Sequence, residues 1–180
     1  MNLQELIEQA SSAGIIDAQT NSFYKLKDIL INEIVPKSKH KKIVFLYLNQ
    51  SFGSLQTLLS FYLTSHTLVL LSDSMPLPLK ENLEKIYTPQ FIFDEKRDGL
   101  REVHDEYLNL NPKVRLLLST SGTTGSPKFV KLSDENLISN AEAINQYLPI
   151  QEDDITPLNL SLYYSYGLSI LHSNLLKKNS

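Results

Sequence analysis

Cysteine is absent from this 180-residue sequence, which excludes a disulfide framework, a thiolate metal site and a cysteine nucleophile. A basic excess is missing too, because 17 Lys and Arg stand against 20 Asp and Glu, and no basic stripe is available for nucleic-acid phosphates. No apolar run approaches the roughly 20 residues of a membrane span. Polar residues interrupt the N-terminus, which is therefore no signal peptide. We expect a cytoplasmic protein with no nucleic-acid partner and no membrane span.

The composition is that of a globular protein, with 42% hydrophobic and 21% charged residues. The length predicts one α/β domain over residues 1–180. The chain begins with a predicted surface helix that Asn2 caps and Gly14 ends, with an apolar stripe formed by Leu3, Leu6, Ile7 and Ala10.

Short apolar runs then alternate with helical patterns. Strands are predicted at 43–48, 67–71, 91–93, 114–118 and 129–132, and a further one at Ile155. Helical faces are predicted within 55–63, 79–87 and 137–148, with Ile86 on the apolar face of the second and Ser133 as the N-cap of the last. Residues 94–112 are predicted as a polar surface excursion with one short helix. This order predicts an α/β fold, with a mostly parallel sheet and helices on both faces. Ligands of such sheets bind at the carboxyl ends of the strands.

One of these ends carries a loop suited to an anion with many oxygens. Residues 119–128 contain two glycines, five hydroxyl side chains and the cation Lys128. Backbone amides, hydroxyls and an ammonium group together suit a polyphosphate. A hydroxyl-rich turn in a scaffold protein is the alternative, although Pro127 and the strands on both sides argue against it.

Three familiar motifs do not fit this loop. A Walker A loop needs Gly before the lysine and Ser or Thr after it, whereas Lys128 stands between Pro127 and Phe129. The dinucleotide pattern G-x-G-x-x-G and the hydrolase pattern G-x-S-x-G are absent as well. The four histidines share no metal-ligand spacing, so we predict no metal site.

The segment Thr120-Ser-Gly-Thr-Thr-Gly-Ser-Pro-Lys128 resembles the phosphate-binding signature of the acyl-adenylate-forming superfamily, the AMP-dependent synthetases and ligases. Phe129 departs from the glycine usual in that family. A second stretch, 160–168, is similar to the family's Leu-Pro-Leu segment, with Ser161 in the proline place and Tyr164 in the frequent histidine place. The resemblance implies the N-terminal part of the adenylate-forming fold, with Tyr164 as a candidate for the substrate pocket.

The family joins a small-molecule carboxylate to ATP, with Mg²⁺, to form an acyl-AMP. It then usually passes the acyl group to CoA or to the phosphopantetheine thiol of a carrier protein, so the chain resembles an acyl-CoA synthetase. By this resemblance Lys128 stabilises phosphate charge, and the nucleotide is bound by Lys128 with Thr120, Ser121, Gly122, Thr123, Thr124 and Gly125.

The family's adenine motif, ribose region and C-terminal catalytic lysine are not found in the sequence. We therefore expect residues 1–180 to be an N-terminal fragment of a carboxylate-activating ligase that is inactive in isolation. The alternative is a non-catalytic nucleotide- or acyl-binding module, or one subunit of a split enzyme.

Overall fold

The computed structural model describes residues 1–30, 35, 38, 40–97, 99–106, 108–119, 128–151 and 153–177. Its N-terminal helix α1 (Leu3–Gln9) begins with a capping box between Asn2 and Glu5, and its apolar stripe is fully buried. The prediction that this helix ends at Gly14 is wrong. It passes through the 3₁₀ turn η1 (Ala10–Ser12), and Gly14 opens the strand β1, where the ring of Phe23 fills the space of a Cβ.

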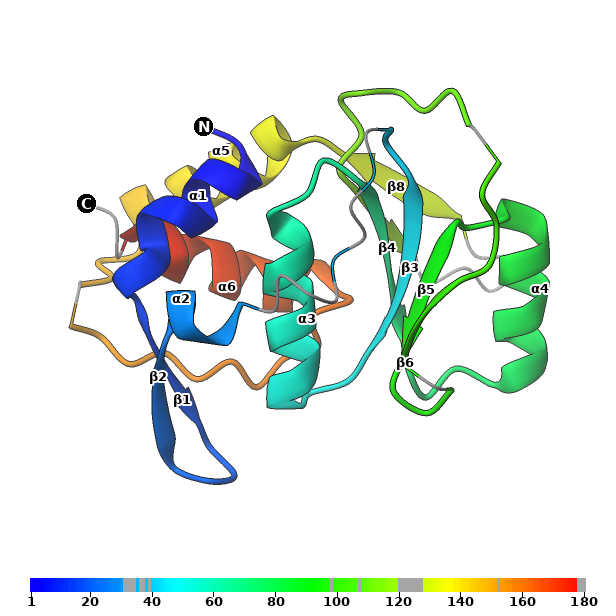
Figure 1. Ribbon diagram of the computed structural model, residues 1–180. Coiled ribbons are helices and arrows are strands. Elements are labelled where there is room, and N and C mark those ends of the chain that lie inside the picture. Colours follow the sequence, from blue (N-terminus) through cyan, green and yellow to red (C-terminus); the bar gives the residue numbers. More distant parts are fainter. Residues whose placement is uncertain are drawn as a thin grey trace.

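The segment that follows is a short hairpin and one helical turn. Strand β1 (Gly14–Asp17) pairs antiparallel with β2 (Ser22–Lys25), and α2 (Leu26–Ile29) comes directly after it. Leu26 and Ile29 are buried in the same core as α1. The helical turn α2 therefore packs onto the body of the protein, whereas the tip of the β1–β2 hairpin projects from it (Figure 1).

The main sheet has six strands in the order β6-β5-β3-β4-β7-β8. Four central strands run parallel: β5 (Phe91–Asp94), β3 (Ile43–Leu48), β4 (Thr67–Ser72) and β7 (Leu116–Ser119). The edge strands β6 (Gly99–Glu102) and β8 (Phe129–Leu132) are antiparallel to their neighbours. The prediction of a mostly parallel sheet is confirmed.

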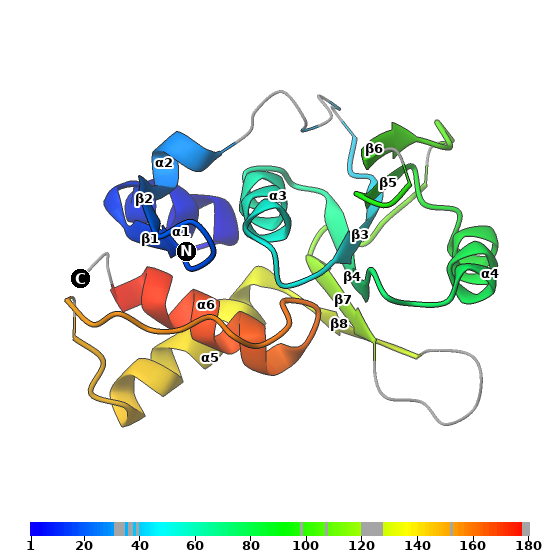
Figure 2. The same ribbon diagram turned by 90° about the horizontal axis from the view of Figure 1, so that it is seen from below.

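Helices cover both faces of this sheet, as predicted. The helices α3 (Phe52–Tyr62), α5 (Asp134–Tyr147) and α6 (Ser165–Lys177) lie on the same side as α1, and α4 (Leu77–Tyr87) lies on the other (Figures 1 and 2). Successive residues of β3 supply the two cores, because side chains alternate across a strand. Leu46 packs on the α3 side, and Phe45 and Tyr47 pack with Leu83 of α4.

Three details differ from the sequence prediction. Where a short helix was expected within 94–112, the described residues form β6, which extends the sheet beyond β5. On α4, Ile86 is 53% exposed and Lys80 is buried in the face turned to the sheet. Ile155 is 80% exposed and lies in no strand.

Within the described ranges, no helix combines enough length with enough apolar character to cross a bilayer.

Candidate functional site

The two described ends of the predicted phosphate loop, Ser119 and Lys128, lie at the carboxyl end of β7. Ser119 pairs with Phe129 in the antiparallel register of β7 and β8. Seven loop residues are predicted to bind the nucleotide, and of these the structure describes Lys128. The other six lie outside the described residues: Thr120, Ser121, Gly122, Thr123, Thr124 and Gly125. The structure therefore places the two ends of the loop, at Ser119 and Lys128.

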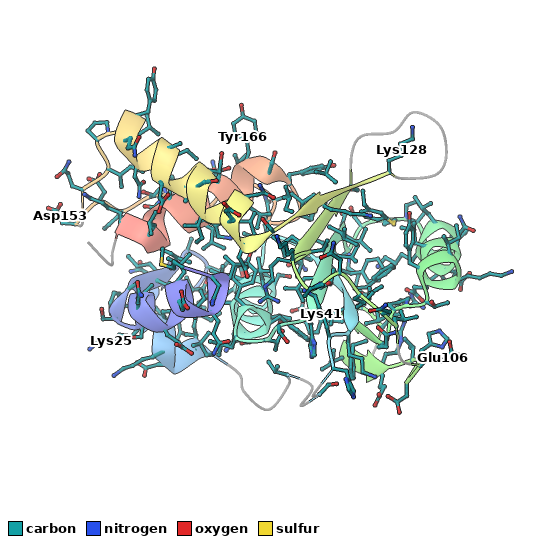
Figure 3. The ribbon with its side chains drawn as sticks, turned by 90° about the horizontal axis from the view of Figure 1, so that it is seen from above. Lys25, Lys41, Glu106, Lys128, Asp153 and Tyr166 are labelled. Atoms are coloured by element: carbon teal, nitrogen blue, oxygen red, sulfur yellow. The ribbon has the colours of Figure 1, made fainter. Side chains whose placement is uncertain are left out.

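Lys128 stands immediately before β8 and is exposed. Its side chain points away from the body of the molecule (Figure 3). Phe129, the departure from the family's glycine, packs its ring edge-on against Tyr87 of α4, with ring centroids 5.2 Å apart. The bulky residue thus fills space on the α4 side of the sheet, next to the lysine that carries the predicted charge.

A polar cluster, which we call the strand-end cluster, lies where β3 and β4 end and consists of Asn49, Asp73 and Lys96. The Asn49 amide nitrogen donates to Asp73 Oδ2 over 3.2 Å, and Lys96 Nζ lies 2.9 Å from the same oxygen. Partial burial disfavours the charged carboxyl, but the hydrogen bonds from Lys96 and Asn49 outweigh this effect and lower the pKa of Asp73. The carboxylate therefore stays ionised at the edge where ligands of such sheets bind.

A second charged group lies deeper, under α4. Lys80 Nζ is 2.7 Å from Asp94 Oδ2 and 4.3 Å from the ring centre of Tyr47. The Tyr47 hydroxyl donates to Glu84 over 3.0 Å, and burial together with Glu84 raises the pKa of Tyr47. Neither this group nor the strand-end cluster was predicted from the sequence. A usable signal existed, because Asp73 and Asp94 each stand at the end of an apolar strand.

Tyr164, the candidate pocket residue, lies in the turn before α6 and is 53% exposed. Its ring contacts that of Tyr163, with centroids 4.8 Å apart, and Tyr163 packs against the main core. Tyr166 on the first turn of α6 is 77% exposed and points outward (Figure 3). The side-chain amide of Gln50 donates to the Asn159 carbonyl over 2.7 Å, which fastens this segment to the loop after β3.

The structure brings Lys128 and the strand-end cluster to the same edge of the sheet. The cluster follows the carboxyl ends of parallel strands, and Lys128 precedes Phe129, which pairs with Ser119 at the carboxyl end of β7. Within the described ranges, no three His, Asp or Glu side chains gather closely enough to hold a metal ion.

No family model matches the sequence. A probable CoA ligase, CCL9 of Humulus lupulus, is 38% identical over 63 residues, which is 35% of this chain and 12% of that protein. Escherichia coli MenE with bound OSB-AMS superposes with a TM-score of 0.74 at 14% identity, and ATP-bound MatB from Rhodopseudomonas palustris with 0.76 at 16%.

Each of these two superpositions covers 99% of this chain and 44% of the solved one, so the chain spans less than half of their length. At such low identity the likeness concerns the fold. It confirms, at that level, the resemblance that the loop and the strand order predicted. The chain therefore has the fold of the N-terminal portion of the adenylate-forming ligases.

Proposed function

We propose that this chain is the N-terminal, phosphate-binding part of an ATP-dependent ligase that activates a carboxylate as its acyl-AMP. One observation carries the proposal: the loop with the Thr-Ser-Gly-Thr-Thr-Gly signature joins β7 to β8 at the carboxyl edge of the sheet, and Lys128 stands at its end. The ATP bound to MatB and the OSB-AMS bound to MenE support a nucleotide as the ligand of this fold.

In the proposed reaction a carboxylate oxygen attacks the α-phosphorus of ATP and pyrophosphate leaves. The protein must hold two anions in line and stabilise the charge that collects on the leaving group. Lys128 is exposed and would supply a cation for that charge. The glycine and hydroxyl residues of 120–125 would supply further donors.

We propose no residue of this chain as a ligand of Mg²⁺ or as a binding partner of the acceptor thiol. Mg²⁺ is usually held by one or two carboxylates together with substrate phosphates. Among the described residues no group of three or more His, Asp or Glu side chains is placed to hold the ion, so substrate phosphates would have to supply most of its non-protein ligands. CoA or a phosphopantetheine thiol would accept the acyl group, and Tyr164 would border the carboxylate because it is exposed beside α6.

We further propose that residues 1–180 alone do not form acyl-AMP. The sequence contains neither the adenine motif nor the catalytic lysine that the family uses for this step. Purified protein should fail to exchange labelled pyrophosphate into ATP with any carboxylate. Carboxylate-dependent exchange would contradict this part of the proposal and would favour an independent enzyme.

Phosphate binding itself is tested by calorimetric titration with ATP and with pyrophosphate. Lys128→Ala should weaken both by about 10- to 100-fold, since a hydrogen bond to a charged group contributes roughly 1.5–3 kcal/mol. Lys131→Ala is the matched control, because Lys131 is an exposed lysine on the same strand, β8. Equal binding by the two variants, or no binding by the parent protein, would overturn the proposal and favour a scaffold.

A further inference from the structure

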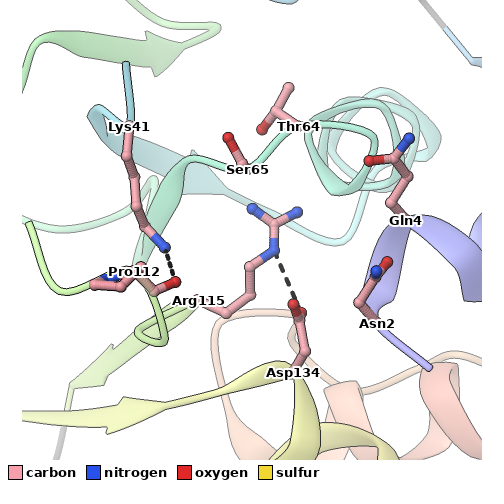
Figure 4. A pocket seen from close by; sticks show the side chains of 8 residues that line it. All are labelled: Asn2, Gln4, Lys41, Thr64, Ser65, Pro112, Arg115 and Asp134. Atoms are coloured by element: carbon pink, nitrogen blue, oxygen red, sulfur yellow. Dashed lines mark hydrogen bonds and ion pairs between the residues drawn. The ribbon is translucent and has the colours of Figure 1, made fainter. Parts of the chain in front are cut away.

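A polar pocket of about 140 Å³ lies at the amino ends of the central strands, at the opposite end of β7 from the phosphate loop. Its wall is built from separate segments, with Lys41 before β3, Ser65 before β4, Arg115 before β7 and Gln4 on α1 (Figure 4). One buried water needs roughly 10–15 Å³, so the pocket has room for a small ion and several waters. Gln4 and Ser65 are exposed and leave it open to solvent.

Arg115 forms the fixed part of the wall. It is 4% exposed, and its guanidinium donates to the carbonyls of Phe61 and Tyr62 at the C-terminal end of α3 and to that of His66 before β4. A cation is favourable there because the end of a helix carries partial negative charge. Arg115 Nε also lies 3.5 Å from Asp134 Oδ1, so the one carboxylate of the wall is paired with this arginine.

Lys41 is the second cation of the wall, and its environment differs. Its ammonium donates to the carbonyl of Pro112 over 2.8 Å, a neutral partner (Figure 4). Among the described residues no carboxylate forms an ion pair with it. Burial and the nearby Arg115 lower the pKa of Lys41, and Asp134 opposes them only in part. An ammonium has three donors, so two remain for a ligand.

The charges of the wall therefore favour an anion over a cation. Lys41 and Arg115 contribute two positive charges and Asp134 one negative charge, and the negative one already faces Arg115. Side-chain amides of Asn2 and Gln4 and the hydroxyl of Ser65 can donate further hydrogen bonds. We propose that this pocket binds a small oxyanion, a phosphate or a carboxylate, through Lys41.

Binding there would stabilise the folded protein, because a ligand that binds only the native state adds to its stability. The anion would connect α1, the ends of α3 and α5, and the entries to β3 and β7, which belong to distant parts of the chain. This site is separate from the proposed nucleotide site, because the two lie at opposite ends of the strands. Its existence does not depend on ligase function.

The test uses inorganic phosphate, and acetate in a parallel arm, at constant ionic strength with chloride as reference. Every protein carries Lys128→Ala, so binding at the phosphate loop is suppressed. Phosphate should raise Tm and shift the amide NMR signals of Gln4 and Ser65. A response to phosphate with none to acetate assigns the site to phosphates, and a response to both assigns it to oxyanions in general.

Adding Lys41→Met should weaken phosphate binding at least tenfold, whereas Lys85→Met, an exposed lysine on α4, should leave it unchanged. Lys41 is half-buried with a single neutral partner, so this variant is expected to fold. Equal affinity in the two variants, or phosphate shifts that spare Gln4 and Ser65, would overturn the proposal. Failure of the Lys128 titration would leave this result unaffected, since it depends on the difference between the Lys41 and Lys85 variants and on the signals of Gln4 and Ser65.

Discussion

The ammonium group of Lys80 lies 2.7 Å from a carboxylate oxygen of Asp94, and the two side chains are 4% and 0% exposed. Lys80 comes from α4 and Asp94 from the last position of β5, so the pair ties the helix to the sheet. Burying two charges is costly, and each is tolerated because the other is present. The ring of Tyr47 adds a favourable surface for the ammonium.

Removing Lys80 alone should therefore be strongly destabilising. Lys80→Met leaves the Asp94 carboxylate buried without its partner, and the free energy of unfolding should fall by about 3–5 kcal/mol in urea denaturation. Lys85→Met on the exposed side of α4 should change it by less than about 0.5 kcal/mol. The double variant Lys80→Met/Asp94→Asn should lose less than the sum of the single variants; additive losses would argue against a coupled pair.

Stability should depend on pH through His172. Its Nε2 lies 2.9 Å from the Tyr62 hydroxyl in a fully buried position, and burial lowers the pKa of His172 from 6.5 to about 4. Between these two values the unfolded chain binds a proton that the folded protein does not, so stability falls as the pH drops from 6.5 to 4. The loss amounts to about 3 kcal/mol.

Denaturation at several pH values for His172→Gln and the parent protein checks this. The variant should lose that part of the slope whatever its stability at pH 7. His104→Gln, at an exposed position, should keep the parent slope. An unchanged slope in His172→Gln would show that the imidazole does not carry the effect.

Gly167 should not tolerate a side chain. A Cβ there would lie 2.4 Å from the backbone oxygen of Ser161 and 2.9 Å from that of Leu160, in the turn that carries Tyr164. Gly167→Ala should cost about 1–3 kcal/mol, because backbone must move. At Gly53 the nearest atom belongs to the flexible side chain of Glu95, so Gly53→Ala should cost less. Thermal denaturation of both variants tests this difference. Equal Tm values would contradict the close contact at Gly167.

The start of α5 depends on Ser133. Its hydroxyl accepts from the backbone N–H of Asn136 over 3.2 Å, and the Asn136 side chain accepts from the Ser133 N–H in return. Ser133→Ala should lower the free energy of unfolding by about 1 kcal/mol in urea. Ser139→Ala, in the exposed middle of the same helix, is the control and should be nearly neutral. A loss no larger than that of the control would mean that the cap is replaced by water.

Local chemistry explains why much of the fold could be predicted. The apolar run 43–48 is too short for a typical helix and forms β3, and Ser133 caps α5 as expected from its side chain. The helix predicted near 94–112 failed because a polar edge strand has no strong pattern of its own. That segment becomes β6 only because β5 offers an unpaired edge.

The candidate site shows the same division. The signature in 119–128 is local, so it could be recognised from the sequence alone. Ser119 and Phe129, which pair across β7 and β8, are also close to each other in the sequence. The strand-end cluster and the Lys80–Asp94 pair were not predicted, because their members come together from separate βα units. Spacing along the chain carries little information about such distant pairs.

By itself, the sequence determined the alternation of elements, the helix cap at Ser133 and the loop chemistry, since these depend on neighbours a few residues away. Tertiary structure alone decided that Lys80 is buried while Ile86 is exposed. It also placed Lys41 and Arg115 in one pocket, although 74 positions separate them. Burial and charge depend on what packs across the sheet, and that is settled only when the strand order β6-β5-β3-β4-β7-β8 has formed.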